Sequence, residues 1–122
     1  MNLRSWLRKW SVFALLLAPL ALAAAGPNVI ELGIVRGKPE GGVRTVRLER
    51  GDSFALAVRS DEALEVHVHG YDVKLSVAAN ARASVRLDAK LVGRFPVTAH
   101  LHGAAGKKAH EPTLLYLEVH PR

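Results

Sequence analysis

The chain has 122 residues, with 17 lysines and arginines, 11 acidic residues and no cysteine. This length suits one small domain, and the lack of cysteine excludes disulfides, thiolate metal sites and a cysteine nucleophile. The net charge is +6, but three of the basic residues lie in the first ten positions with no acid among them, and the remaining basic residues are scattered. Nucleic acid is not an expected partner, because binding it needs a continuous basic face with stacking aromatic side chains.

The N-terminal segment is predicted to be a secretory signal peptide. A basic first decapeptide precedes an apolar run over residues 11–25 that ends in alanines, which is the composition of such peptides. A membrane anchor is the rival interpretation, but spanning needs about 20 apolar residues, and this run is shorter and is interrupted by Pro19. We therefore expect cleavage after Ala25 or Ala23, a single mature domain over residues 26–122 with no membrane association, and a periplasmic location.

The rest of the chain alternates apolar and polar residues with the two-residue period of strands. Turn clusters of Gly, Asp and Asn separate these segments, and no segment keeps a helical period for long. Seven or eight short strands at roughly 8–12-residue intervals predict an all-β, antiparallel sandwich. The expected strands are 29–35, 44–49, 53–59, 64–69, 72–77, 83–87, 95–101 and 114–120.

Histidines are the one chemical cluster of the sequence. Four of the six lie in two His-x-His-Gly segments, and a fifth lies in the long connection before the last strand. In a strand, both rings of a His-x-His segment leave the same face. If the two segments meet at one end of neighbouring strands, up to four imidazoles could converge, and imidazole is a good ligand for copper. The candidate metal ligands are His67, His69, His100, His102 and His110, with Glu65 as a possible addition.

A second interpretation needs no metal. The outer face of an alternating strand is polar by default, and histidine is an ordinary residue there. His120, beside the C-terminal Pro121, is expected to be a tail residue, and Phe95 and Tyr116 are expected in the core. No nucleophile elbow and no suggestively placed pair of carboxylates is present, so we do not expect an enzyme.

The order of these motifs resembles that of the cupredoxin family, Greek-key sandwiches that hold copper at one end. The segment His69-Gly-Tyr is similar to the His-Gly-aromatic segment around the first copper histidine in exported cupredoxin domains. The segment Gly93–His100, followed by a loop and a final strand, resembles the Phe-x-Cys-x-x-His…Met loop of blue copper proteins. The resemblance implies a Greek-key sandwich with copper ligands at His69 and His100.

The sequence departs from the blue copper pattern at two ligands. Val97 stands where the resemblance places the thiolate ligand, and Met1 is the only methionine. Blue copper electron transfer rests on a trigonal His₂Cys site, so this chemistry is excluded. We predict an exported cupredoxin-like protein that binds copper through histidines as a carrier, a buffer or an accessory to another periplasmic copper protein. The alternative is a metal-free sandwich that acts as a protein-interaction module.

Overall fold

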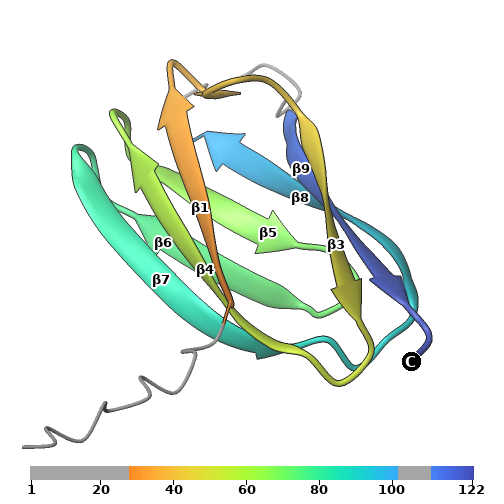
Figure 1. The fold of residues 1–122 in the computed structure, drawn as a ribbon. Helices are drawn as coiled ribbons and strands as arrows, with labels where there is room; N and C mark the ends of the chain where they lie inside the picture. The colour runs from red at the N-terminus through yellow and green to blue at the C-terminus, as the bar shows by residue number, and fades with distance from the viewer. Residues whose placement is uncertain (1–27, 102–110) are drawn as a thin grey trace, which may run out of the picture.

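The computed structural model describes residues 28–101 and 111–122, which form two packed β-sheets (Figure 1). The predicted signal peptide lies outside these residues and stays a prediction. No helix that could cross a membrane is found in the described ranges. The strands are β1 (Asn28–Val35), β2 (Lys38–Pro39), β3 (Arg44–Glu49), β4 (Ser53–Ser60), β5 (Leu64–Val68), β6 (Val73–Val77), β7 (Ala81–Asp88), β8 (Gly93–Leu101) and β9 (Thr113–His120).

The strands divide into a four-stranded sheet and a five-stranded sheet. Their orders are β2-β1-β4-β7 and β3-β9-β8-β5-β6, so the predicted all-β sandwich is confirmed. Each sheet also contains one parallel pair, β1 with β4 and β3 with β9, where only antiparallel pairing was expected. Alternation of apolar and polar residues tells which side chains face the core, but it does not tell the direction of the neighbouring strand.

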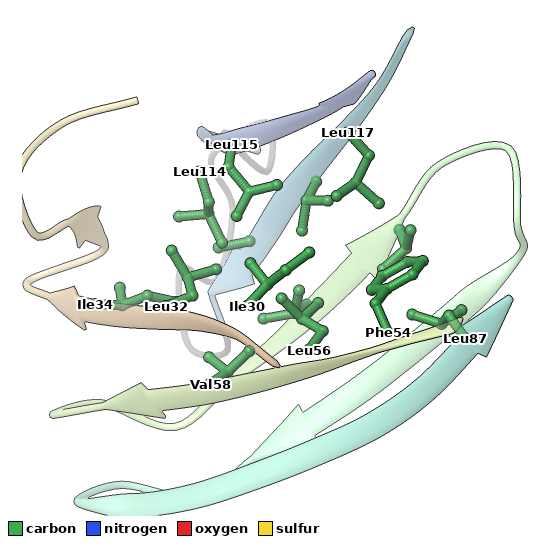
Figure 2. Packing of buried hydrophobic residues seen from close by; sticks show 14 of the residues in the cluster. Ile30, Leu32, Ile34, Phe54, Leu56, Val58, Leu87, Leu114, Leu115 and Leu117 are labelled. Carbon is green, nitrogen blue, oxygen red and sulfur yellow. The ribbon is translucent and has the colours of Figure 1, made fainter. Parts of the chain in front are cut away.

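The inner faces of the two sheets meet in an apolar core. Figure 2 shows Phe54, Leu56 and Leu87 from the four-stranded sheet pointing towards Leu115 and Leu117 of the other sheet. Each of these five side chains is buried. Because the chain has no cysteine, burial of this apolar surface takes the stabilising role that disulfides have in many small exported domains.

The two aromatic residues expected in the core have different positions. Phe95 is partly buried and packs against the core cluster, as predicted. The prediction for Tyr116 is wrong, because its neighbours Leu115 and Leu117 are the residues of β9 that face inward, both with no exposed surface. Tyr116 therefore faces outward, and the guanidinium carbon of Arg94 lies 4.1 Å from its ring centroid, a cation–π contact.

Candidate metal site

The first histidine pair lies on the outer face of the five-stranded sheet. Leu64, Val66 and Val68 of β5 are fully buried, so the alternating residues of this strand face away from the core. This places His67 on the outer face, and His69 follows the strand on the same side. The predicted separation of apolar and histidine faces is confirmed.

The two imidazole rings of this pair lie side by side. The centroids of His67 and His69 are 4.1 Å apart, with 34° between the ring planes. The Nε2 atom of His69 is 3.0 Å from the Oγ1 atom of Thr98, which is 6% exposed and lies directly opposite His67 on β8. Thr98 therefore fixes the orientation of the His69 ring. Thr98 is not among the residues predicted from the sequence, although its position two residues before His100 places both on one face of a strand.

The third candidate ligand, His100, lies on the same sheet face. It is directly opposite Glu65 of β5, so it is a diagonal neighbour of His67. The Nδ1 atom of His100 is 3.1 Å from Oε1 of Glu111, and both side chains are about two-fifths exposed. We call the surface formed by Glu65, His67, His69, Thr98 and His100 the histidine face.

The histidine face brings candidate ligands near one another, but their side chains do not surround a common position for a metal ion. Among the described residues, no three His, Asp or Glu side chains lie close enough to hold one metal ion in this conformation. His102 and His110 lie outside the described residues, so their positions stay predictions. His120 is the exposed last residue of β9, where its Nε2 atom is 2.7 Å from Oε1 of Glu118.

The position expected for a thiolate ligand faces the other way. Val97 pairs with Val68 and is fully buried, so its side chain points into the core. His69 and His100 belong to the outer face. The resemblance places Val97 at a ligand position that would share one metal with His69 and His100, and this placement is wrong. Residues an odd number of positions apart in one strand, such as Val97 and His100, point to opposite faces.

Comparison with known proteins gives matches in structure only. No family model and no curated protein sequence matches the chain significantly. One chain of a heme-copper terminal oxidase dimer has a TM-score of 0.56 at 15% identity, over 78% of this chain and 66% of that one. A multicopper oxidase has a TM-score of 0.58 at 17% identity, over 76% of this chain and 42% of that one. A copper binding protein solved by NMR in the apo form has a TM-score of 0.51 at 12% identity, over 75% and 86% of the two chains.

The fold is cupredoxin-like. Identities this low establish the fold alone, and the chain spans less than two thirds of the oxidase chains in the first two comparisons. A cupredoxin-like domain of the blue copper kind needs a thiolate beside two imidazoles. The chain has no cysteine, and the inward-facing residues near the end of β8, Val97 and Ala99, are fully buried and apolar. The residues present do not fit a blue copper centre.

Proposed function

We propose that this protein binds a copper ion through the histidine face, with His67 and His69 as the central pair. It would serve as a periplasmic carrier, buffer or accessory to another copper protein, and not as an enzyme. The observation that carries the proposal is the side-by-side placement of two imidazoles, with centroids 4.1 Å apart, on one outer strand face. Copper proteins with the same fold add support, among them a multicopper oxidase and a copper binding protein.

The chemistry of the pair suits Cu²⁺. This ion has the highest affinity for nitrogen ligands among the divalent first-row metals. Two imidazoles that already lie together lose little side-chain freedom when both bind. In the tautomer with its proton on Nε2, His69 donates a hydrogen bond to Thr98 and leaves the Nδ1 lone pair for a metal. Metal-ligating histidines commonly have such an orienting partner.

Further ligands would come from the same face and from the adjoining loop. Glu111 orients the ring of His100, which would reach the pair by a change of side-chain rotamer. His102 and His110, outside the described residues, stay candidate ligands from the sequence. Three or four imidazoles would supply the nitrogen ligands of the tetragonal site that Cu²⁺ prefers.

Removing either histidine of the central pair should weaken copper binding. We expect His67→Ala and His69→Ala each to raise the Kd for Cu²⁺ at least about tenfold, since one ligand of a chelating pair is lost. Isothermal titration of the purified protein measures this. His120→Ala is the matched control, because His120 lies on β9 beside Glu118, and it should leave Kd unchanged. Equal losses in all three variants would indicate adventitious surface binding.

Thr98 should act through His69 as a positioning residue. Thr98→Val keeps the shape of a side chain that is 6% exposed, but it removes the hydroxyl that lies 3.0 Å from Nε2 of His69. We expect Kd for Cu²⁺ to rise about three- to tenfold, in the range seen when orienting partners are lost, and the far-UV circular dichroism spectrum to stay the same. Rescue by Thr98→Ser would separate the lost hydroxyl from a packing effect; an unchanged Kd in Thr98→Val would contradict the role.

A second candidate function is a metal-free interaction module. Its support comes from Val97 and Ala99, which are apolar and fully buried. They lie in the part of β8 where the resemblance to blue copper proteins would place a metal ligand. The copper titration distinguishes the two functions, because a metal-free module would show no saturable binding of Cu²⁺ at one equivalent.

A further inference from the structure

The sandwich is closed along one side and open along the other. β6 and β7, the last strands of their sheets, lie against each other. On the opposite side a groove separates β1 from β3, made of two adjoining hollows of about 470 and 440 Å³ that share Glu31 and Arg44. Core residues Ile30, Leu32 and Leu114 contribute to its lining. We call it the β1–β3 groove.

Among the described residues, the edge of β1 that borders this groove is hydrogen-bonded at only some of its backbone groups. Successive residues of a strand direct their backbone groups to opposite sides. The carbonyl of Ile34 accepts a hydrogen bond from Asp61, on the β4 side. The carbonyl of Gly33 accepts one from Glu40, on the groove side, and that of Glu31 accepts one from the Arg44 side chain. The amides of residues 29 and 31 therefore point into the groove.

Two glycines explain why this edge is left open. β2 pairs with β1 only at Ile34 and Val35, and no other described strand pairs with the groove side of β1. After Glu40 the chain passes through Gly41 and Gly42, whose φ angles of 77° and 84° are readily adopted only by glycine. This turn carries the chain away from β1 to β3 in the other sheet (Figure 1). An open strand edge is a template for pairing with another chain.

The rim of the groove shows what kind of segment fits. Three guanidinium groups line it, from Arg44, Arg59 and Arg82, against the two carboxylates of Glu31 and Glu40. The exposed side chain of Arg82 forms a surface ion pair with Glu31, and such a pair adds little stability and can exchange. Net positive charge at the rim favours a partner with acidic side chains.

Glu40 is an intramolecular example of such binding. Its amide pairs with the carbonyl of Gly33 on the β1 edge, at 2.8 Å. Its carboxylate lies over Gly33, where a Cβ atom would overlap it, and approaches Nη2 of Arg59 to 3.6 Å. Glu40, the turn residue directly after β2, thus already combines edge pairing with an arginine contact.

We propose that the β1–β3 groove binds an extended acidic segment of a partner protein, which adds to β1 as an antiparallel strand in line with β2. Main-chain hydrogen bonds to residues 29 and 31 would supply affinity, and alternate side chains would supply specificity. Apolar side chains on one face of the segment would cover Ile30 and Leu32 in the groove, and its carboxylates would pair with Arg44 and Arg59. The proposal is independent of copper, because the histidine face belongs to β5 and β8.

A proline at position 29 tests the edge directly. The probe is a labelled hexapeptide of alternating Val and Glu, titrated into the purified full chain by fluorescence anisotropy. Val29→Pro removes a groove-side N–H that no ladder bond with β4 needs, and edge strands tolerate proline. We expect it to weaken binding of the peptide at least fivefold. Val29→Ala, the matched control, removes the side chain and keeps the amide, so it should change Kd less than twofold.

The charge requirement is tested by reversal. Arg44→Glu should weaken binding of the Val-Glu peptide at least fivefold. The same variant should bind a matched peptide of alternating Val and Lys more tightly than the original protein does. No saturable binding of the acidic peptide, equal affinity for the two peptides, or equal effects of Val29→Pro and Val29→Ala would overturn the proposal. A concentration-dependent dimer without peptide, abolished by Val29→Pro in sedimentation, would assign the edge to a second copy and would overturn it as well.

Discussion

Gly70→Ala should lower the free energy of unfolding by about 3–5 kcal/mol, from backbone strain and overpacking together. Gly70 follows His69 directly and has a φ of 83°, a conformation that costs a residue with a Cβ atom. An added Cβ would also overlap Cδ1 and Cε1 of the Phe95 ring. That ring is held in place, because Tyr71 packs edge-on against it with centroids 5.2 Å apart.

Thermal and urea unfolding of the two variants Gly70→Ala and Gly41→Ala separates strain from overlap. Gly41 has a similar φ of 77°, but nothing lies within 4 Å of the Cβ that alanine would add there. We expect Gly41→Ala to cost only about 1–2 kcal/mol, the cost of strain alone, and Gly70→Ala to lower Tm by at least about 10 °C in a domain of this size. Equal costs would mean that the Phe95 ring moves aside freely.

The same substitution should affect the candidate metal site. The amide of His69 donates a hydrogen bond to the carbonyl of Pro96, and Gly70 ends this paired segment with its turn. A backbone shift at Gly70 therefore moves His69 relative to Thr98. Copper affinity of the folded fraction should fall in Gly70→Ala and should stay unchanged in Gly41→Ala.

The part of the fold that was predictable from the sequence is which side chains are buried, because apolar residues repeat with the two-residue period of a strand. The alternation in 64–69 assigns Leu64, Val66 and Val68 to the core and the histidines to the other face, as found. The parallel pairing of β1 with β4 was not predictable in this way. These strands become neighbours because the chain leaves the β1 edge at Gly41 and Gly42 and forms β3 in the other sheet before it returns as β4.

The candidate site shows how alignment to a sequence motif can assign a residue to the wrong face of a strand. Aligning Phe95–His100 with a blue copper loop assumes that the residue at Val97 and His100 meet at one metal. The segment is a continuous strand here, so residues at odd separation face opposite sides. Applied to β8, the same period places Thr98 with His100 on the outer face, next to β5. Pairing of β5 with β8 could not be read from the sequence, since it joins strands that are distant in the chain.

Thr98→Cys should convert the histidine face into a copper–thiolate site. The Thr98 hydroxyl is 3.0 Å from Nε2 of His69, and the residue lies directly opposite His67. A cysteine is close in size to threonine and is tolerated in buried surroundings. The new sulfur would therefore stand beside two imidazoles and complete a His₂Cys set, the ligand set whose copper–thiolate bonding defines blue copper sites.

Added Cu²⁺ should then give an intense visible charge-transfer band in Thr98→Cys, measured anaerobically and quickly because Cu²⁺ oxidises free thiols. His69→Ala in the same background should abolish the band. Val97→Cys is the matched control, one residue away but with its side chain in the core against Val68. We expect no band from it, because its thiol is separated from both imidazoles by the sheet. A band from Val97→Cys and none from Thr98→Cys would show that β8 presents the opposite face to the histidines, and the histidine face as defined here would be wrong.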